Sequence, residues 1–459
     1  MAVYLSYEYS KAVLGGVAVE KISVFIKGLA AIAATNCCML TSLYLHGTAM
    51  KILAIAASVV YILVLCIYPC KSKEGGRLGR IHRGSFLMKI FLIAVTADIG
   101  LNVYFGLCGR GWKAVLINCV TAFVMLALIF MISAWRLYLS SVQLGIRWRA
   151  LGAVFAFIPV INIIILVHMI RLADDEYTDE VARIALDKSR AADKICQTKY
   201  PILMVHGVFF RDVKLINYWN RIPAALEKNG AKIFYGKQQS ADSVANIAAE
   251  LKARIDEIVE SEGCEKVNII AHSKGGLNAR WAVGMLGADE RVASLTTINT
   301  PHRGCQFADY LLSKAPEGFK NAVANKYNAA LKKLGDKDPD FIAAVTDLTA
   351  SGCAEINRQC KDSPKVFYQS VGSYSVSALG GRFPMNLSYL FVKYFDGKND
   401  GLVSVDSMKW GEKFILLDPP AKRGITHADI IDLNRENIKG FDVREFYVGL
   451  VSDLKKRGF

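Results

Sequence analysis

The stretch 266-KVNIIAHSKGGLNARWAVGML-286 begins as an apolar run, turns at Ser273 and resumes with apolar residues at helical spacing. Two interpretations fit this corner. One is a strand-to-helix turn that only needs small residues, because glycine allows backbone angles that other residues resist. The other is a nucleophile elbow, in which a strained turn holds a serine hydroxyl clear of the sheet, with a helix amino terminus behind it. Ala271 stands where the elbow pattern usually has its first glycine, and alanine is small enough for that position.

Hydrophobic residues are concentrated in the first 170 positions of the 459-residue chain. They make up 53% of all residues, and the mean hydropathy of +0.28 is high for a wholly soluble protein. Several apolar runs are about long enough to cross roughly 30 Å of hydrocarbon as helices. They lack the regularly spaced charges of a helix at a soluble surface. We predict a transmembrane helical region over 1–170, with about five spans at 28–45, 52–68, 90–108, 114–135 and 150–170.

The formal net charge of +15 is distributed unevenly. In residues 1–170, 15 Lys or Arg stand against 4 Asp or Glu, and in residues 171–459, 41 stand against 37. Much of the excess lies in 71–89 and 136–149, which is typical of cytoplasmic loops, so we expect a membrane and no nucleic acid as partner. If the amino terminus is also cytoplasmic, five spans place the rest of the chain, after residue 170, outside the cytoplasm. One span more or fewer places it inside. The expected localisation is a multi-pass protein of the plasma membrane with an extracytoplasmic catalytic domain.

The eleven cysteines of the chain have neither framework nor metal-site spacing, so we predict no disulfide-built fold.

One feature of the membrane region leaves an alternative open. Asp98 interrupts an apolar run, where carboxylates are often functional. The alternative is that Asp98 pairs with a polar neighbour such as Asn102.

A charged helical connector over 171–199 precedes the second domain, 200–459. There, short apolar runs alternate with amphipathic stretches such as 242–261, which is the βαβ rhythm of a mostly parallel sheet covered by helices. Ligands of such sheets bind beyond the carboxyl ends of the strands, where Ser273 falls. We predict strands near 201–206, 232–236, 266–272, 293–299, 365–372 and 413–418.

A serine nucleophile needs a base that takes its proton and a carboxylate that orients the base. Of the four histidines in the second domain, His206 ends the first strand, His272 should point away from the Ser273 side chain, and His302 lies in a loop. By elimination His427 is the base.

The acid should lie on a loop between the serine and the histidine. The order serine, acid, histidine along the chain is the one that goes with a strand-to-helix elbow. Asp400, in 396-DGKNDGLVS-404, is flanked by turn formers and follows an apolar run. Asp396, Asp406 and Asp418 are rivals on sequence alone, since aspartate is common in turns.

Backbone N–H donors should stabilise the tetrahedral oxyanion. We expect one from Lys274, directly after the nucleophile, and the other from the loop 206–212, at Val208.

Five blocks of the second domain resemble the bacterial triacylglycerol lipase family of α/β hydrolases. They are YPILMVHGV at 200–208, KVNIIAHSKGGLNARW at 266–281, SLTTINTPHRGCQFAD at 294–309, NDGLVS at 399–404 and THADIIDLN at 426–434. The resemblance implies an α/β-hydrolase fold, Ser273 as nucleophile, Asp400 as acid and His427 as base. It also implies oxyanion donors at Val208 and Lys274.

The resemblance has two departures and one open point. The family's calcium site uses one aspartate upstream of the catalytic acid and another two residues after the catalytic histidine. Asp429 matches the second, but 363–394 contains no acidic residue to match the first. No cofactor is therefore expected, and Asp429 is a doubtful calcium ligand. The membrane region is the second departure. The segment 303–362 corresponds to the family's lid region, and an ordinary helical insertion is the alternative.

The leading hypothesis is a membrane-anchored serine ester hydrolase that cleaves carboxylic esters of acyl lipids or other hydrophobic substrates. The alternatives are an acyltransferase or a phospholipase with the same triad. A hypothesis of another class is a membrane scaffold or sensor with a non-catalytic, ligand-binding domain. The sequence identifies no protein partner.

Overall fold

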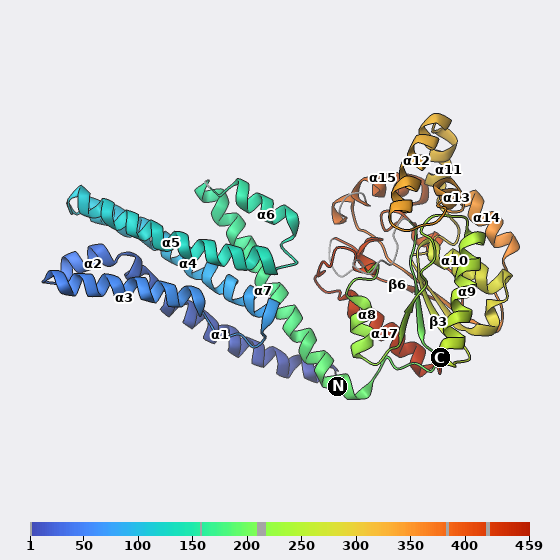
Figure 1. The fold of residues 1–459 in the computed structure, drawn as a ribbon, viewed down its shortest axis with the longest axis horizontal. Coiled ribbons are helices and arrows are strands. Elements are labelled where there is room, and N and C mark those ends of the chain that lie inside the picture. Colours follow the sequence, from blue (N-terminus) through green and yellow to red (C-terminus); the bar gives the residue numbers. More distant parts are fainter. Residues whose placement is uncertain (1, 157, 209–216, 382–384, 419–422) are drawn as a thin grey trace. The chain divides into compact units, whose positions relative to one another are not determined.

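The computed structural model describes residues 2–156, 158–208, 217–381, 385–418 and 423–459. The chain forms two compact units, Met1–Ala185 and Leu186–Phe459 (Figure 1). The boundary falls within helix α7 (Pro159–Arg190). The charged residues after 170 therefore continue an apolar helix, and no separate connector helix begins at residue 171.

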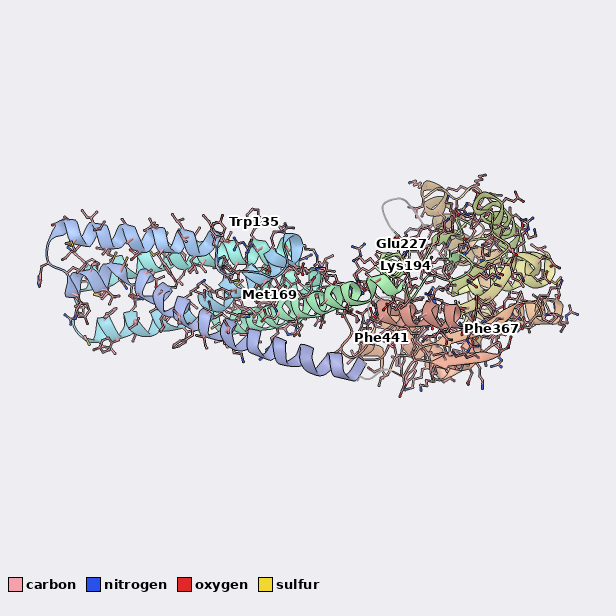
Figure 2. The ribbon with its side chains drawn as sticks, turned by 90° about the horizontal axis from the view of Figure 1, so that it is seen from below. Trp135, Met169, Lys194, Glu227, Phe367 and Phe441 are labelled. Atoms are coloured by element: carbon pink, nitrogen blue, oxygen red, sulfur yellow. The ribbon has the colours of Figure 1, made fainter. Side chains whose placement is uncertain are left out.

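The first unit is helical. Three of its described helices are long and apolar enough to cross a membrane, and a bent pair raises the number to four. Apolar side chains on the outside of these helices suit hydrocarbon, as at Trp135, whereas Met169 is fully buried (Figure 2). The helices are α1 (Ala2–Thr35), α2 (Cys37–Tyr44), α3 (Thr48–Ile67), α4 (Gly76–Leu107), α5 (Trp112–Ser140), α6 (Gly145–Val154) and α7.

The predicted span at 150–170 is wrong as a single helix. Helix α6 ends at Val154, and α7 begins at Pro159, a residue type suited to the first turn of a helix. The apolar part of α7 then ends before Arg171. Its residues 160–170 reach about 17 Å, well short of the roughly 30 Å of a hydrocarbon core.

The predicted span at 28–45 is broken at Asn36, where α1 and α2 meet at a bend of 71°. The Asp98 carboxylate lies at this break and accepts hydrogen bonds from Thr35 Oγ1 (3.0 Å) and Asn36 Nδ2 (2.5 Å). Asn102 instead donates to the backbone carbonyl of Asp98 (2.9 Å). Asp98 therefore does have polar partners, and its carboxylate stabilises the helix break.

The second unit contains a six-stranded, all-parallel sheet in the order β2-β1-β3-β4-β5-β6. Each strand coincides with a predicted one to within two residues at either end, which confirms the predicted fold class. The strands are β1 (Ile202–Val205), β2 (Ile233–Tyr235), β3 (Val267–His272), β4 (Val292–Ile298), β5 (Phe367–Gly372) and β6 (Lys413–Leu416).

Alternating side chains of the strands bury two opposite faces of the sheet. In β1, Ile202 and Met204 belong to the core shared with α8 (Ile222–Lys228) and α17 (Val443–Lys456). Leu203 and Val205 belong to the core on the other face. That second core includes residues of α9 (Val244–Glu262) and α10 (Lys274–Met285) (Figure 1).

The segment 303–362 is helical and follows β4. It contains α11 (Gln306–Lys314), α12 (Glu317–Lys333), α13 (Phe341–Thr346) and α14 (Ala350–Gln359). Two more helices, α15 (Met385–Asp396) and α16 (Val405–Met408), lie between β5 and β6 in the chain, and short 3₁₀ turns end or join several elements. These turns are η1 (Ala191–Asp193), η2 (Ala288–Arg291), η3 (Ala378–Gly380) and η4 (Asp429–Ile431).

Candidate active site

Ser273 occupies a strained corner between β3 and α10. Its backbone angles are φ 54° and ψ −132°, a sparsely populated combination for a residue with a side chain. Such a conformation costs about 1 to 3 kcal/mol and persists only where surrounding contacts enforce it. Here the Ser273 amide donates to the Ile298 carbonyl (2.9 Å), and Thr300 Oγ1 donates to the Ser273 carbonyl (2.8 Å). This geometry favours the elbow over a simple βα turn.

The glycines after Ser273 allow close approach of the neighbouring strands. A Cβ atom at Gly275 would lie 2.4 Å from the backbone oxygen of His206, and one at Gly276 would lie 2.2 Å from Thr300 Oγ1. Likewise, a Cβ at Gly207 would lie 2.9 Å from the Cβ of Ser273. The 206–208 backbone and the start of α10 therefore pack directly around the serine.

Asp400 and His427 are brought together by the fold. His427 Nδ1 lies 2.6 Å from Asp400 Oδ2, and the His427 amide also donates to the Asp400 carbonyl (3.0 Å). Asp400 is fully buried and His427 is 7% exposed. A buried carboxylate at Nδ1 holds a histidine in one orientation and leaves Nε2 for proton transfer.

Three other donors fix the Asp400 carboxylate. Asn299 Nδ2 donates to Oδ2 (2.7 Å), and the amides of Leu402 and Val403 donate to Oδ1 (2.9 and 2.8 Å). Asn299 has a positive φ of 46° at the end of β4 and also donates to Ser373 Oγ (2.7 Å). The sequence reasoning missed Asn299, although its place one residue after a strand that borders the Ser273 strand was a usable signal.

The rival aspartates have other partners. Asp396 accepts from the amides of Gln306 (3.2 Å) and Phe307 (3.3 Å). Asp418 accepts from the Tyr374 hydroxyl, and the Asp406 carbonyl accepts from Arg303. Of the four candidate acids, Asp400 is the one paired with His427.

His272 is a second residue that the sequence reasoning missed. Its ring centroid lies 4.4 Å from that of His427, and its Nδ1 lies 2.6 Å from the Tyr218 hydroxyl. Burial, reinforced by the neighbouring His427, holds the pKa of His272 well below its ordinary value. Together with the Tyr218 hydroxyl that holds it, the His272 ring forms one wall beside the base.

The other two histidines of this unit hold loops. His206 lies between the carbonyls of Gly207 (2.8 Å) and Gln238 (3.1 Å). His302 contacts Thr297 Oγ1 (2.9 Å) and stacks on Trp410, and burial holds its pKa well below the ordinary value. Both contacts agree with the elimination that selected His427.

The two predicted oxyanion donors belong to the two segments that meet at Ser273, the start of α10 and the backbone after β1. Lys274 is the first residue of α10, so its amide is one of the helix's free amino-terminal N–H groups. Val208 follows Gly207, the residue whose Cα faces Ser273. Residues 209–212 of the predicted loop lie outside the described residues.

Asp429 is poorly suited to bind calcium. Its Oδ2 accepts from the amide (2.9 Å) and hydroxyl (2.7 Å) of Thr426, and its Oδ1 accepts from Arg423 (3.1 Å). Calcium sites collect six to eight oxygen ligands, and a guanidinium against the carboxylate opposes a second cation. The described residues contain no cluster of three or more His, Cys, Asp or Glu side chains suited to a metal.

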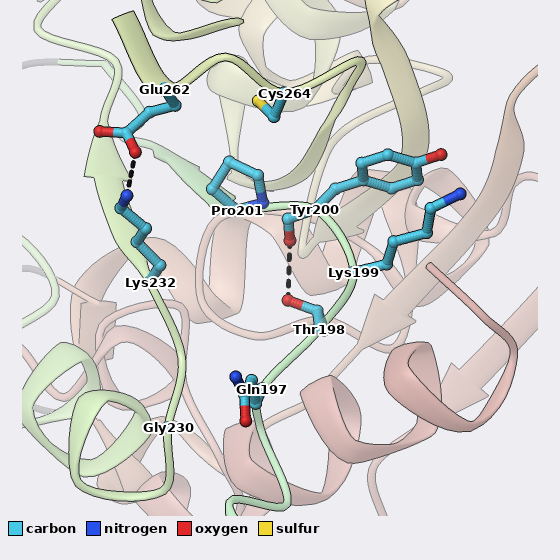
Figure 3. A pocket seen from close by; sticks show the side chains of 9 residues that line it. All are labelled: Gln197, Thr198, Lys199, Tyr200, Pro201, Gly230, Lys232, Glu262 and Cys264. Carbon is cyan, nitrogen blue, oxygen red and sulfur yellow. Dashed lines mark hydrogen bonds and ion pairs between the residues drawn. The ribbon is translucent and has the colours of Figure 1, made fainter.

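A cavity of about 260 Å³ lies at the amino-terminal ends of the strands (Figure 3). Its lining includes Pro201, Lys232 and Cys264, which precede β1, β2 and β3. Lys232 pairs with Glu262 across it. Ser273 lies at the carboxyl end of β3, at the other end of the strands, so this cavity is separate from the candidate active site.

Sequence comparisons point to lipases. The chain is 34% identical over 180 residues to a triacylglycerol lipase of Burkholderia plantarii, covering 37% of this chain and 50% of that protein. It is 28% identical over 298 residues to a triacylglycerol lipase of Pseudomonas fragi, covering 58% and 99%. The second unit has an α/β-hydrolase fold and is similar in sequence to triacylglycerol lipases.

Two further comparisons place this hydrolase unit among its relatives. A triacylglycerol lipase of Pseudarthrobacter phenanthrenivorans is 34% identical over 179 residues, covering 36% of this chain and 56% of that protein. The chain thus spans about half the length of the first curated relatives it matches. A family model described as palmitoyl protein thioesterase matches residues 201–337.

Solved structures with related folds include the mature lipase of Bacillus licheniformis, at 23% identity and a TM-score of 0.42, covering 55% of this chain and 92% of that one. A metagenomic carboxyl esterase has 12% identity and a TM-score of 0.44, covering 57% and 76%.

Proposed function

We propose that this protein is a membrane-associated serine ester hydrolase that cleaves carboxylic esters of acyl lipids through an acyl-enzyme on Ser273. The observation that carries the proposal is the buried pair of Asp400 and His427, whose Oδ2 and Nδ1 atoms lie 2.6 Å apart. Ser273 occupies its strained turn at the carboxyl end of β3. Similarity to triacylglycerol lipases supports hydrophobic esters as substrates.

In this mechanism Ser273 Oγ attacks the ester carbonyl while His427 Nε2 accepts the hydroxyl proton. Asp400 holds the resulting imidazolium, and the amides of Lys274 and Val208 donate to the oxyanion. His427 then protonates the departing alcohol oxygen as the carbon–oxygen bond breaks. Water, deprotonated by His427, attacks the acyl-enzyme and releases the carboxylic acid and Ser273. No step requires a metal ion or a cofactor.

The test is fluorophosphonate labelling and p-nitrophenyl ester hydrolysis by the full-length protein in detergent. We expect Ser273→Ala to abolish labelling and to lower kcat by about 10⁴-fold or more. A folded wild-type protein that neither reacts with the probe nor hydrolyses the ester would overturn the proposal and favour the non-catalytic scaffold.

A thioester hydrolase is the second candidate function, because the palmitoyl protein thioesterase model matches residues 201–337. The same three residues would cleave a carbon–sulfur bond. Relative kcat/KM for a long-chain acyl thioester and its oxygen-ester analogue separates the two candidates. Product analysis with added lipid acceptors separates hydrolysis from acyl transfer, since free fatty acid alone counts against transfer.

The membrane side of the hydrolase unit depends on the number of spans. We propose four spans, with the bent pair α1 and α2 counted as one, because the predicted fifth is too short. An even number returns the hydrolase unit to the side of the amino terminus, the cytoplasm by the positive-inside rule. Labelling of intact cells by a fluorophosphonate that cannot cross membranes would instead support the five-span, extracytoplasmic arrangement expected from sequence. Cell fractionation tests the proposed plasma-membrane location.

A further inference from the structure

The side chain of Lys274 is buried immediately behind the nucleophile. It is 1% exposed, although lysine is almost never fully buried without a partner. Its Nζ donates to the backbone carbonyl of Asp242 (2.7 Å) and lies 3.7 Å from Asp347 Oδ2. A buried ammonium is tolerated only where hydrogen bonds and an opposite charge compensate its lost hydration. The site provides both.

These contacts join three segments that are far apart in the sequence. Asp347 directly follows α13 as its carboxyl-terminal cap, and its Oδ2 also accepts from the amide of Val244 (2.5 Å), the first residue of α9. Asp242 lies two residues before Val244. Lys274 therefore connects the nucleophile elbow to the loop that precedes α9 and to the insertion 303–362.

Val208 contacts the same surroundings. Its side chain packs on a small buried cluster formed by Ala241, Leu331 and Ala344. Ala241 adjoins Asp242, Leu331 belongs to α12, and Ala344 belongs to α13. Both residues expected to supply oxyanion amides thus rest on the loop before α9 and on the insertion.

We propose that Lys274 is a positioning residue for the oxyanion hole, whose side chain fixes the elbow to Asp242 and Asp347 so that the insertion supports the two amide donors. The inference rests on the proposed function and deepens it. It gives part of the 303–362 segment a role beneath the catalytic centre, in addition to any action as a lid. Small displacements of a preorganised donor are costly, because the oxyanion must be met at hydrogen-bonding distance.

The support depends on the proton of Lys274. Burial lowers the pKa of Lys274 to about 8, and Asp347 and Asp242 oppose that shift. Cys353 of α14 also faces the ammonium, and burial raises the pKa of its thiol to about 12, so it remains protonated. The ammonium is therefore paired with Asp347 below about pH 8 and loses its charge above that pH, when the ion pair is lost.

The experiment measures kcat and KM of the full-length protein in detergent with a p-nitrophenyl ester, from about pH 6 to about pH 10. The variants are Lys274→Met, Lys274→Arg and Asp347→Asn. Lys413→Met is the matched control, since Lys413 on β6 pairs with Asp453 of α17 (3.0 Å), away from the elbow. Fluorophosphonate titration gives the concentration of competent sites, to which each kcat is referred.

We expect Lys274→Met to lower kcat by about 10- to 100-fold while KM changes less than about twofold, because the lost interaction serves the transition state. The wild type should lose kcat above about pH 8, and Asp347→Asn should move this loss to lower pH, since a carboxylate favours the charged lysine. Lys274→Arg should abolish the alkaline loss, because arginine stays charged. Lys413→Met should match the wild type.

Wild-type kcat and pH dependence in Lys274→Met and Asp347→Asn would overturn the inference while leaving the proposed hydrolase intact. A wild type that neither hydrolyses esters nor reacts with the probe would instead remove the proposed function itself. If Lys274→Met does not fold, Asp347→Asn and Lys274→Arg decide, since both keep polar groups at these positions. If both variants then lost kcat at the same alkaline pH as the wild type, the inference would be contradicted.

Discussion

The ring of His272, the residue before the candidate nucleophile, lies 4.4 Å from the ring of the candidate base His427. His272 is 1% exposed and is itself held by the Tyr218 hydroxyl. The base is therefore bordered on two sides, by the Asp400 carboxylate at Nδ1 and by the tilted ring of His272 beside it.

His272→Ala should lower kcat by about 10- to 100-fold, because a base that is free to tilt spends less time in line with the serine. The measurement is ester hydrolysis, with kcat referred to sites titrated by fluorophosphonate. His168→Ala, in the first unit, serves as the control histidine variant. Unchanged kcat in His272→Ala would show that Asp400 alone positions the base.

Asn299→Ala should reduce kcat/KM by about tenfold, since removing a hydrogen bond to a charged group costs about 1.5 kcal/mol or more. Asn299→Asp should be more damaging, because a second carboxylate would face Asp400 Oδ2 in a buried site and one of the two would have to bind a proton. Steady-state kinetics test both. Equal activity in the alanine and aspartate variants would contradict this account of the carboxylate.

Gly276→Ala should destabilise the hydrolase unit by about 1 to 3 kcal/mol, the usual cost of overpacking a tight site. The new methyl group would collide with the Thr300 side chain, 2.2 Å from Oγ1 and 2.7 Å from Cγ2. Denaturant unfolding measures the loss. The double variant Gly276→Ala with Thr300→Ala should lose less unfolding free energy than the two single variants lose together. If the two losses simply added, the proposed collision would be excluded.

Acid should destabilise the hydrolase unit through its buried histidines. The folded-state pKa values of His272 and His302 lie well below their ordinary value near 6.5. Below about pH 6.5 the unfolded chain binds protons that the folded chain does not, so stability falls as pH falls. Each histidine contributes a slope of about 1.4 kcal/mol per pH unit. Unfolding free energies of the wild type and His302→Gln between about pH 7 and pH 5 test this, and equal slopes would contradict it.

Calcium chelation should leave both hydrolysis and thermal stability unchanged. The Asp429 carboxylate accepts from Thr426 and Arg423, which satisfies its charge without a divalent ion. Activity and Tm with EDTA, or with added calcium, provide the measurement. A Tm rise with calcium that disappears in Asp429→Asn would show that the cation displaces Arg423.

The six strands were predictable from sequence because each is a short apolar run whose pattern reflects burial on one or both faces of a sheet. The corner at Ser273 was also visible in the sequence, because small residues flank the serine, although contacts with Ile298 and Thr300 hold its strained angles. The spans were only partly predictable. Apolar length indicated the long helices at 52–68, 90–108 and 114–135, which could cross a membrane. The bend at Asn36 and the break before Pro159 instead depend on helix packing and backbone geometry.

Local sequence thus determined the order of strands and helices, the position of the turn at Ser273 and the choice of His427. The tertiary structure decided which of four aspartates meets that histidine, that Asn299 and His272 surround the pair, and that the Lys274 side chain reaches Asp242 and Asp347. The reason is physical. Backbone pattern reports burial along one segment, whereas contacts between side chains depend on strand register and loop course, which form only when distant segments pack together.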